Sequence, residues 1–507
     1  MGIYAGVDCG TQSTKVILID TDTNKILGLG NAPHQLICEV NGRREQNPKW
    51  WVSAFKNAFS DAVKNAGIFP QQINAISVSG QQHGLVVLDS QGEPLYPAKL
   101  WCDTETSSEN ERILEIIGGK DACLEKLGLV IETGYTASKL LWLKENHPAL
   151  WKKIDTVLLP HDYLNYWLTG NRVMEFGDAS GTGLFNIYKR NWDNDILNII
   201  DSSGLLYSAL PNLILNNQVV GVVRPEVAEI LNLNIDTLVA TGSGDNMMGA
   251  IGTGNIEPGI VTMSLGTSGT LYAYSPIPID PASKSIANFC SVNNGWLPLI
   301  CTMNVTSATS LVQNLFSLDL DNFNYKLTKS ELGSKGIITF PFFNGERVPS
   351  LPTAKASIHG LDSKNFTIEN LCRSIVEGIT FGLRYGLELL KSSGLKVSQI
   401  RLIGGGSKSV IWRQMVADVM DCEVICLTNT EAAALGAAIQ AAWVHQLKNN
   451  INTYVSEEVL LKEINRKFVI LDADTLTLPD IDNVKKYDCY YLKYKSLLNK
   501  YYLEKDI

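Results

Sequence analysis

An acidic residue, a glycine and several hydroxyl side chains lie between two apolar runs in the stretch GVDCGTQSTKVILID (6–20). This pattern predicts a β-hairpin with its turn at 9–14. A turn of small residues presents several backbone N–H groups together, and the resulting concavity suits a phosphate. Because an aspartate repels an anion unless a cation lies between them, Asp8 beside this turn indicates a metal–phosphate site. The alternative interpretation is a polar hairpin that only reverses the chain.

A second stretch, VTMSLGTSGTLYAYS (261–275), repeats the same plan of strand, Gly-Thr turn and strand about half a chain later. Such a spacing is typical of a duplicated domain. In the repeat, Ser264 stands at the position of Asp8. Two phosphate-binding hairpins with one acid between them predict a nucleotide held across two similar domains, with its metal held mainly from the first.

Other candidate residues follow predicted strands. Asp245, in GSGDNMMGAIG, comes directly after a strand and starts a predicted helix, so it is either a helix N-cap or a general base that points into a cleft. Gln82 and His83 lie in a glycine-bounded loop, and Asp103 lies close to Trp101 in AKLWCDTET. Aromatic faces beside hydrogen-bonding groups are how proteins hold sugars, which predicts a site for a hydroxylated ligand. The alternatives are a structural histidine, a buried tryptophan and a surface acid.

The stretch GGGSKS (404–409) lies at a predicted strand-to-helix turn, where the backbone can approach a flat or anionic ligand closely. The alternative is a tight loop that needs positive φ angles. The chain has no GxxxxGK[ST] motif, and this stretch lacks the last glycine of GxGxxG. Neither of these two common nucleotide-binding motifs therefore applies.

The elements that must position these residues alternate between strand-like and helix-like patterns, which predicts an α/β fold. A cluster of Gly, Asn and Pro at 252–259 predicts the boundary between two domains. A long helix is expected at about 367–391. Three of its glycines lie four residues apart on one stripe, which predicts close packing against another backbone. These glycines are Gly378, Gly382 and Gly386.

Near the end of the chain, Thr428 and Glu431 have the spacing of a capping box at the start of a helix rich in small residues. The Lys- and Tyr-rich segment that follows is expected to be helical, and no chemistry is assigned to it. We therefore expect an N-terminal domain at 1–253, a C-terminal domain at 254–445 and a helical extension at 446–507 that packs on the C-terminal domain.

The chain has 507 residues, enough for two or three domains, and its 45% hydrophobic and 19% charged residues are typical of soluble globular proteins. A formal net charge of −9 disfavours nonspecific nucleic-acid binding, and no apolar run approaches the roughly 18 residues that span a bilayer. The chain opens directly on a strand pattern without a signal-like segment, and its ten cysteines form no CxxC motif. We expect a reduced, cytoplasmic protein. The sequence leaves the oligomeric state open, with a homodimer as one expectation.

Several motifs, in order, resemble those of the FGGY carbohydrate kinases, in the superfamily of actin, Hsp70 and sugar kinases. GVDCGTQSTK and MSLGTSGT are similar to the two phosphate motifs, GGGSKSVIWRQMVADV to the adenosine motif and EAAALGAAIQAAW to the connecting helix. GYTASKLLWLKEN and ASIHGLDSKNFTIENLCRSIVE fit the two signature patterns, and NGERVP is similar to the Gly-Glu-Arg-x-Pro element. The resemblance covers roughly residues 3–445 and implies two ribonuclease H-like domains, as in actin-like ATPases, with a central cleft between them.

The resemblance also implies roles for single residues. Asp245 is expected to act as the general base, and Asp8 to position Mg²⁺ and the phosphates of ATP. The expected sugar-binding residues are Gln82, His83, Trp101, Asp103 and Asn246. The expected ATP-binding residues are Gly10, Thr11, Gln12, Lys15, Gly266, Thr267, Gly405, Gly406, Ser407 and Ser409.

Within the family, SGQQHG, AKLWCDTET, HDYLNYWLTG and FGDASGTGLFNI are most similar to members that act on D-xylulose. The implied activity is transfer of a phosphoryl group from ATP to D-xylulose, giving D-xylulose 5-phosphate. Gln82 stands where many bacterial members carry methionine, so D-ribulose, L-ribulose or another polyol is an alternative substrate. An alternative of another class is a nonenzymatic ATP-gated switch, which would not need the candidate sugar-binding residues together with Asp245.

Overall fold

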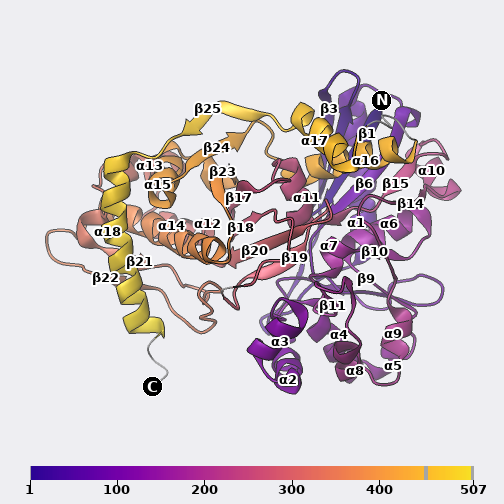
Figure 1. The fold of residues 1–507 in the computed structure, drawn as a ribbon, viewed down its shortest axis with the longest axis horizontal. Coiled ribbons are helices and arrows are strands. Elements are labelled where there is room, and N and C mark those ends of the chain that lie inside the picture. The colour runs from indigo at the N-terminus through magenta and orange to yellow at the C-terminus, as the bar shows by residue number, and fades with distance from the viewer. Residues whose placement is uncertain (1, 282, 450–454, 504–507) are drawn as a thin grey trace.

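The computed structural model describes residues 2–281, 283–449 and 455–503, and each of its two halves is built around a seven-stranded sheet (Figure 1). We call the half with the first sheet the first lobe and the half with the second sheet the second lobe. The first sheet consists, in spatial order, of β14 (Val219–Val222), β15 (Leu238–Ala240), β6 (Ile73–Gly80), β1 (Ile3–Cys9), β2 (Ser13–Asp20) and β3 (Lys25–Pro33), with β16 (Ser243–Gly244) beside β6. The second sheet consists of β19 (Ala287–Cys290), β20 (Trp296–Thr302), β18 (Gly269–Ala273), β17 (Gly259–Leu265), β23 (Val397–Ile403), β24 (Glu423–Leu427) and β25 (Leu471–Thr477).

Helices cover the two sheets. Those of the first lobe are α1 (Pro48–Ala66), α2 (Ser107–Ile117), α3 (Lys120–Leu127), α4 (Thr136–Asn146), α5 (Pro148–Trp151), α6 (Pro160–Thr169), α7 (Phe176–Ala179), α8 (Asn194–Ile200), α9 (Leu205–Ala209), α10 (Pro225–Leu231) and α11 (Asp245–Gly252). Those that follow are α12 (Thr306–Leu315), α13 (Leu320–Thr328), α14 (Ile368–Ser392), α15 (Val410–Met420), α16 (Ala432–Lys448), α17 (Glu457–Phe468) and α18 (Ile481–Leu498). Short strands outside the two main sheets are β4 (Ile37–Cys38), β5 (Arg44–Gln46), β7 (Val86–Leu88), β8 (Ala98–Lys99), β9 (Thr156–Leu158), β10 (Val173–Glu175), β11 (Phe185–Asn186), β12 (Asn191–Trp192), β13 (Asn212–Ile214), β21 (Ile338–Phe340) and β22 (Ser357–His359).

The first sheet is buried on both faces at its centre, because helices lie on either side of it. β1 and β6 are almost wholly buried, as central strands between two helical layers are. On one face α16 approaches so closely that a Cβ at Gly6 would lie 2.0 Å from the Ala434 oxygen. On the opposite face α1 approaches Gly30, where a Cβ would lie 1.9 Å from the Ala58 oxygen. Glycines in the strands thus let both helices pack directly on the sheet.

The second sheet repeats the plan of the first. β1 pairs antiparallel with β2 and parallel with β6, and β17 pairs antiparallel with β18 and parallel with β23. The next strand outward, β15 or β24, is also parallel, and the strand beyond it, β14 or β25, is antiparallel. The duplication predicted from the two Gly-Thr hairpins is therefore present in the sheet topology.

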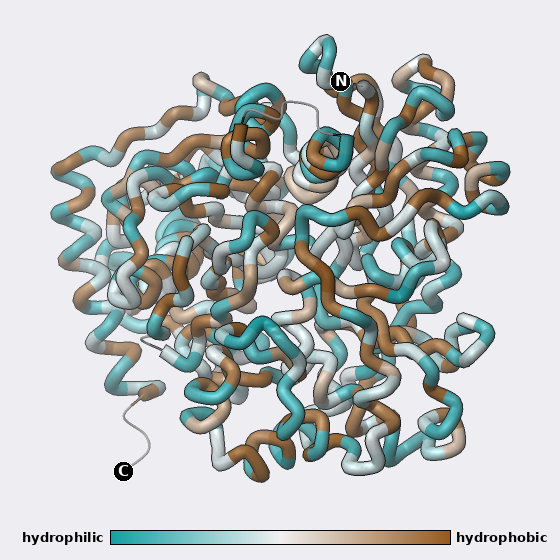
Figure 2. Tube along the Cα trace, turned by 45° about the vertical axis from the view of Figure 1, so that its right-hand side comes forward, coloured by the Kyte–Doolittle hydropathy of each residue, from teal (hydrophilic) through white to brown (hydrophobic). Residues whose placement is uncertain are grey.

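The last part of the chain contacts both lobes. α16 packs on β1, β6 and α11, and α17 packs on α16. β25 then pairs with β24, and α18 packs along α14 and α15, far from α16 (Figure 1). Figure 2 shows apolar and polar residues alternating along α18, whose buried face carries Tyr487, Tyr491 and Tyr494. Residues 450–454 and 504–507 of the expected C-terminal extension lie outside the described residues.

The predicted capping box at the start of α16 is wrong. The N-cap is Glu431, and it makes no capping hydrogen bond through its side chain. Thr428 Oγ1 donates instead to the Ile470 carbonyl (3.2 Å), and Glu431 Oε2 accepts from Lys15 Nζ (2.5 Å). Both side chains have tertiary partners, which their spacing in the sequence does not indicate.

The long helix expected at about 367–391 is α14, at 368–392. A Cβ at Gly378 would lie 2.0 Å from the Thr339 oxygen, so this glycine packs against backbone as predicted. Gly386 faces the side chain of Ile300, and Gly382 has only ordinary van der Waals contact. The prediction of backbone packing therefore holds for one of the three glycines.

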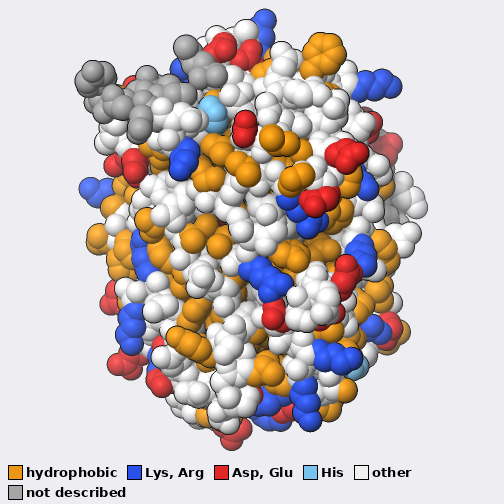
Figure 3. All heavy atoms as spheres, turned by 90° about the vertical axis from the view of Figure 1, so that its right-hand side faces the viewer, with side chains coloured by type: hydrophobic (Ala, Val, Ile, Leu, Met, Phe, Trp, Pro, Cys, Tyr) orange, Lys and Arg blue, Asp and Glu red, His pale blue; other side chains and the backbone are white. Residues whose placement is uncertain are grey.

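Within the described residues, no helix combines the length and the apolar composition needed to cross a membrane. Figure 3 shows one face of the first lobe, on which acidic and basic side chains are interspersed and apolar side chains lie scattered among them. The charges on this face are not segregated by sign.

Candidate active site

The carboxyl ends of three neighbouring parallel strands meet at one edge of the first sheet. Asp8, near the end of β1, lies beside Ser79 of β6, and Ser79 Oγ donates to Asp8 Oδ1 (2.9 Å). Gly80, at the end of β6, pairs with Gly244 of β16, and Asp245 follows directly. The carboxyl edge of a parallel sheet is where ligands of α/β proteins bind. The fold thus brings the two acids singled out in the sequence to the same edge.

Asp245 is the first residue of α11 and does not cap it, because Gly244 occupies the N-cap. Its Oδ1 accepts from the backbone N–H (2.8 Å) and the Nδ2 (3.0 Å) of Asn246. Oδ2 has no hydrogen bond within the part of the chain that the structure describes. Burial, followed by the charges of Asp8 and Asp178, raises the pKa of Asp245 to about 8. Asp245 is thus a half-buried carboxyl with one free oxygen and a raised proton affinity.

The two Gly-Thr turns present backbone N–H groups that have no hydrogen-bond partner among the described residues. They belong to Thr11 and Gln12 in the first turn and to Thr267 and Ser268 in the second. The start of α12 bonds the carbonyl groups of the second turn, which fixes its conformation. Free N–H groups held in a fixed turn are what an anion such as phosphate requires.

The glycine-rich stretch after β23 packs against the second turn. Gly404 has φ +88°, and a Cβ there would lie 2.7 Å from the Leu265 carbonyl, directly before Gly266. Gly405 has open space on its Cβ side, whereas a Cβ at Gly406 would contact Leu265 and Trp412. The stretch therefore lies beside the second Gly-Thr turn and adds exposed backbone to the same surface.

The hydroxyl groups of this stretch are already engaged. Ser407 Oγ donates to the Gly404 carbonyl (2.7 Å). Ser409 Oγ caps α15 by accepting from the Trp412 N–H (3.3 Å) and donates to Asn324 Oδ1 (2.6 Å). In the described structure these two hydroxyls help to shape the loop, and the expected contact of the two serines with ATP stays a prediction.

Lys15, also expected at the ATP site, forms an ion pair with Glu431 (2.5 Å) at the start of α16. Gly10, beside it in the first turn, closes that turn by donating its N–H to the Ser13 carbonyl (3.1 Å). Lys15 thus joins the first hairpin to a helix that comes more than 400 residues later in the chain.

His83 is held in one tautomer. Its Nδ1 lies 2.6 Å from the Gly181 carbonyl oxygen, and because a carbonyl only accepts, Nδ1 carries the hydrogen. Burial, followed by the charge of Lys139, lowers the pKa of His83 to about 3, so the ring is neutral. Nε2 is then a hydrogen-bond acceptor, which suits a sugar hydroxyl group.

Aromatic rings from both lobes surround His83. Its ring stacks on Tyr135 with 4.3 Å between centroids, and Phe289 of the second lobe lies 5.9 Å away. The backbone of His83 has φ +64°, and its carbonyl accepts from Lys139 Nζ (2.6 Å) and Thr136 Oγ1 (3.2 Å). The unusual backbone conformation is therefore held by two side chains of α4.

Trp101 connects the candidate sugar residues to the first phosphate turn. Its Nε1–H donates to Thr11 Oγ1 (2.9 Å), and Thr11 Oγ1 donates to Gln81 Oε1 (3.1 Å). The hydroxyl of Thr11 thus bonds to two side chains, while its backbone N–H has no partner among the described residues.

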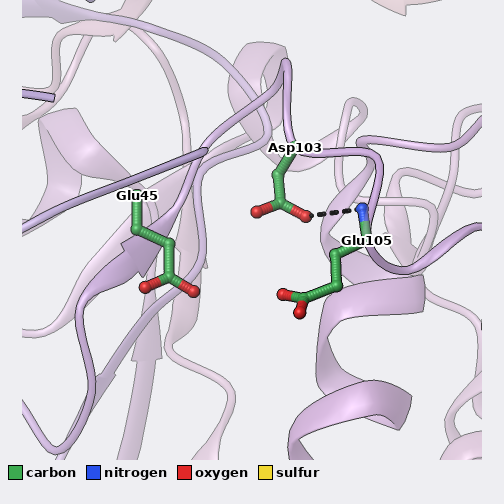
Figure 4. A group of neighbouring side chains, drawn as sticks. All are labelled: Glu45, Asp103 and Glu105. Atoms are coloured by element: carbon green, nitrogen blue, oxygen red, sulfur yellow. Dashed lines mark hydrogen bonds between the residues drawn. The ribbon is translucent and has the colours of Figure 1, made fainter. Parts of the chain in front are cut away.

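Asp103 forms a cluster of carboxylates with Glu45 and Glu105 (Figure 4). Such a cluster could hold a metal, but Lys99 Nζ lies within it, 3.1 Å from Glu45 Oε1 and 3.2 Å from Asp103 Oδ2. Asp103 Oδ1 accepts from the Glu105 N–H (3.1 Å), the dashed line in Figure 4. Asp103 is fully buried with both oxygens engaged. It therefore fixes the loop after Trp101, which differs from the expected contact with sugar.

Gln82 and Asn246 bond to each other. Asn246 Nδ2 donates to Gln82 Oε1 (2.9 Å) as well as to Asp245. Gln82 is only 4% exposed, whereas Asn246 is half-buried. Asn246 is thus the residue of this pair that faces the space beside Asp245, and Gln82 lies behind it.

Arg347 reaches the same region from the second lobe. Its neighbour Glu346 anchors the loop by accepting from the backbone N–H groups of Met303 and Arg347 (both 2.8 Å). The guanidinium group of Arg347 has one weak acceptor, Cys301 Sγ at 3.7 Å, and no carboxylate partner among the described residues. Its charge also contributes to the lowered pKa of His83 in the first lobe. A partly buried cation without an anionic partner suits oxygen-rich ligands.

Sequence reasoning gave no role to Tyr135, Phe289, Arg347 or Asp178. The NGERVP motif was a signal for Arg347, and the first signature stretch contains Tyr135. Phe289 carries no such signal, because its contact with His83 depends on how the two lobes pack. Together, the site residues form an assembly in which two lobes can bring an anionic ligand and a hydroxylated ligand together.

Comparisons with known proteins identify the class of enzyme to which this arrangement belongs. Residues 3–252 match the family model "FGGY family of carbohydrate kinases, N-terminal domain", and residues 261–445 match the corresponding C-terminal domain. The chain is 51% identical over 504 residues to a xylulose kinase from Haemophilus influenzae, covering 99% of this chain and 100% of that protein. It is 36% identical over 442 residues to a xylulose kinase from Streptomyces rubiginosus, covering 87% of each.

Solved structures give the same result. A xyloylose kinase from Brucella ovis superposes with a TM-score of 0.89 at 26% identity, covering 98% of both chains. A xylulose kinase from Bifidobacterium adolescentis gives a TM-score of 0.80 at 28% identity, covering 97% of this chain and 99% of that one. The chain belongs to the FGGY family of carbohydrate kinases. The predicted fold class, two actin-like α/β domains, and the predicted enzyme class, a sugar phosphotransferase, are confirmed.

Proposed function

We propose that this protein transfers the γ-phosphoryl group of ATP to the hydroxyl on carbon five of D-xylulose, giving D-xylulose 5-phosphate and ADP. The observation that carries the proposal is Asp245, a half-buried carboxyl with one free oxygen at the sheet edge that also carries Asp8. The names of the relatives, xylulose kinases at 51% and 36% identity, support the choice of sugar.

Asp245 acts as the general base. Asn246 engages Oδ1, which leaves Oδ2 to accept a hydrogen bond from the reacting hydroxyl. The carboxylate takes the proton as the new bond to phosphorus forms. Burial raises the pKa of Asp245 to about 8, so its ionised form accepts a proton more strongly than an ordinary aspartate, but only the ionised fraction acts as the base.

The backbone of the two Gly-Thr turns binds the phosphates. Thr11 and Gln12 from one side, and Gly266 and Thr267 from the other, surround the β- and γ-phosphates, and Gly405 and Gly406 line the adenosine site. Phosphoryl transfer depends mainly on in-line placement and on the neutralisation of charge. The unpaired N–H groups of the turns supply both without forming a covalent bond.

The donor chemistry around Asp8 fits Mg²⁺. Burial raises the pKa of Asp8 to about 6, and its Oδ2 has no hydrogen bond among the described residues. Mg²⁺ takes one or two carboxylates together with waters and phosphate oxygens, so Asp8 is a sufficient protein ligand. The bound ion would neutralise charge on the phosphates. Asp8 would hold that ion and so keep the phosphate end of ATP at the sheet edge.

The sugar lies between Asp245 and the aromatic cluster. His83 Nε2 and Asn246 Oδ1 accept sugar hydroxyl hydrogens, and the indole of Trp101 supplies an apolar face. Arg347 donates to sugar oxygens from the second lobe. Contacts from two lobes would make tight sugar binding depend on closure of the cleft.

We divide the roles along the chain at the predicted boundaries. Residues 1–253 bind the sugar and carry the base, residues 254–445 bind most of the ATP, and residues 446–507 support both lobes through α17 and α18. α16 belongs by sequence mostly to the ATP-binding part, but it packs on the sheet of the first lobe.

The test is a coupled assay of ADP release by the purified protein with ATP and a panel of sugars. We expect turnover with D-xylulose to exceed that with D-ribulose and L-ribulose, and the product to be a 5-phosphate. Asp245→Asn is expected to leave ATP binding intact and to lower kcat by about 10²–10⁴-fold. Near-normal turnover in this variant would remove the assignment of the base. Sugar-independent ADP release would support a nucleotide-gated switch instead.

We also propose a reducing, cytoplasmic location. All ten cysteines are free thiols, four of them half-buried or exposed, which suits a compartment that keeps thiols reduced. Immunoblotting of cell fractions tests this proposal. A homodimer stays an expectation that sedimentation analysis can decide.

A further inference from the structure

Two buried polar groups of opposite character, an amide donor and a carboxylate acceptor, lie close together behind the proposed sugar site. Gln82 Nε2 is a donor and Asp178 Oδ1 is an acceptor, and neither has another hydrogen-bond partner within the described residues. Burial raises the pKa of Asp178 to about 6, and hydrogen bonds from the side chains of His161 and Gln82 oppose this rise. Both side chains border Gly244, where a Cβ would lie 2.6 Å from Gln82 Cγ and 3.1 Å from Asp178 Oδ1. A buried amide and a buried carboxylate each need a hydrogen-bond partner, and here both side chains lie beside the same glycine.

Asp178 is fixed from behind by an ion pair. His161, fully buried, has Nδ1 2.8 Å from Asp178 Oδ2 and Nε2 3.0 Å from Asp162 Oδ1. Although burial opposes it, these two carboxylates hold the pKa of His161 well above its ordinary value, so the ring is an imidazolium. An imidazolium only donates, and therefore Asp178 presents acceptor oxygens on both sides.

An acceptor at this position determines the orientation of both amides in front of it. Gln82 turns its Nε2 toward Asp178, so its Oε1 faces Asn246 and accepts from Nδ2 (2.9 Å). Asn246 Nδ2 also donates to Asp245 Oδ1 (3.0 Å). Asn246 Oδ1 is then the free atom, an acceptor directed at the ligand.

We propose that Asp178 and Gln82 are positioning residues, which act through Asn246 to set which amide atom meets the sugar and how the Asp245 carboxylate is held. The amide chain (Asp178–Gln82–Asn246–Asp245) runs in one direction, from a buried ion pair to the reacting group. This inference rests on the proposed function for the role of Asp245, and it changes the expected role of Gln82 from sugar contact to orientation of Asn246.

This series of hydrogen bonds gives the glutamine at position 82 a specific role in this protein. Methionine at this position would have no amide to transmit orientation. Gln82→Met keeps similar volume and packing while it removes both hydrogen bonds, and it is therefore the informative substitution. Gly244 is part of the same design, since a Cβ there would separate Gln82 from Asp178.

Other charged groups lie around the residues from Asp178 to Asp245, and their protonation states must stay the same in every measurement. Glu175 lies beside His161 and Asp178, its pKa raised to about 7 by burial, and it accepts from Ser243 Oγ (2.7 Å). Asp162 faces His161, and Asp8 faces Asp245. A pH profile alone would mix all of these groups, so the test compares variants at one pH.

The experiment is a double-mutant cycle at pH 7.5 with Gln82→Met, Asp178→Asn and the double variant. We expect each single variant to raise KM for D-xylulose roughly tenfold, with KM for ATP unchanged. In the Gln82→Met background, Asp178→Asn is expected to have little further effect, because the link is already absent. Gln446→Met is the matched control, a buried glutamine toward the end of α16, and its sugar KM is expected to stay within twofold. Additive effects, or a normal sugar KM in Gln82→Met, would overturn the proposal.

A second measurement does not depend on phosphoryl transfer. In protein labelled with ¹⁵N at asparagine, the Asn246 side-chain amide signal is expected to shift in Asp178→Asn and not to shift further when Gln82→Met is already present. If the wild-type protein fails to phosphorylate D-xylulose, the proposed function is wrong. The amide signals then still show whether Asp178 and Gln82 orient Asn246. If turnover is normal and the Asn246 signal does not shift in Asp178→Asn, the proposed positioning role of Asp178 and Gln82 is wrong and the proposed function stands.

Discussion

Asp245 shows how a reactive residue can oppose the stability of its own fold. Burial and two acids, Asp8 and Asp178, raise its pKa to about 8, whereas an unfolded aspartate titrates near 4. The native state therefore holds this proton more tightly than the unfolded state. The stability linked to that proton is fully present below pH 4 and is lost as the pH rises through 8.

We predict that Asp245→Asn stabilises the protein at alkaline pH. The amide removes the charge repulsion, and the free energy of unfolding is expected to rise by on the order of 1–2 kcal/mol at pH 8.5, with a smaller gain at pH 5.5. Urea unfolding at the two pH values measures the difference. Asp61→Asn, at an exposed site on α1, is the control and should change little. A gain that does not depend on pH would contradict this account.

Arg347 makes a second prediction at the level of a single residue. Because its guanidinium has only a weak sulfur acceptor, its main partners are expected to be sugar oxygens. Arg347→Met should raise KM for the sugar about tenfold or more while KM for ATP and the melting temperature stay near normal. Arg384→Met, on α14, is the control, since Arg384 pairs with Glu388 and Asp488. A normal sugar KM in Arg347→Met would exclude the contact.

The sequence predicted the residue types of the site better than their partners. Asp8 and Asp245 could be singled out because Asp8 lies near the end of a strand and Asp245 directly follows one, and parallel strands end at the same edge. The engagement of Asp103 by Lys99 and of Ser409 by Asn324 was not visible, because those partners come from other elements. A motif states which group is present, and packing decides what that group faces.

At the scale of elements, α11 and α16 meet backbone to backbone. A Cβ at Gly436 would lie 1.9 Å from the Met248 oxygen, and a Cβ at Gly252 would lie 1.7 Å from the Ala432 oxygen. α11 begins with Asp245, so this contact sets the position of the proposed base. Two glycines on different helices thus act as one packing unit.

We predict that Gly436→Ala destabilises the protein and displaces α11. The added methyl group cannot fit beside backbone atoms, so the free energy of unfolding is expected to fall by about 1–3 kcal/mol or more, with a loss of kcat. Gly405→Ala is the control for stability, because its Cβ would meet nothing within 4 Å. Equal melting temperatures for the two variants would show that the packing tolerates a side chain.

The hairpins and the long helix could be predicted from local pattern, because turn chemistry and periodicity are local. The placement of α16 on the first sheet could not, since its sequence shows only that it packs closely. Its small residues fit any near backbone, and only the assembled structure shows that the partners are Gly6 and Gly252. The capping box failed for a similar reason, as Glu431 pairs with Lys15.

At the scale of the whole molecule, a few polar contacts join the lobes around the proposed sugar site. Arg190 donates to the carbonyls of Asn294 (2.7 Å) and Gly295 (3.1 Å), and its guanidinium lies 4.4 Å from the Trp296 ring. Lys284 and Asp121 form a further pair at 2.7 Å, but both are well exposed. Exposed pairs contribute little, so Arg190 is expected to be the stronger link.

We predict that Arg190→Met shifts the lobes toward an open arrangement. Both ligands bind more tightly to the closed form, so KM for sugar and for ATP should rise together, about threefold to tenfold, with kcat little changed. Small-angle scattering should show a larger radius of gyration for the free variant. Lys284→Met is the control and should keep normal constants. A change in only one of the two KM values would argue against a shared closure equilibrium.

The position of α16 also has a consequence for synthesis on the ribosome. The strands of the first sheet are all made by residue 244, but the helix that covers one of its faces begins at Ala432. At a synthesis rate of about 5–20 residues per second, that apolar face stays uncovered for roughly 10–40 s while the second lobe is synthesised. We expect chaperones to bind this exposed apolar surface during the interval, so the yield of native enzyme should depend on their supply more than its final stability would suggest.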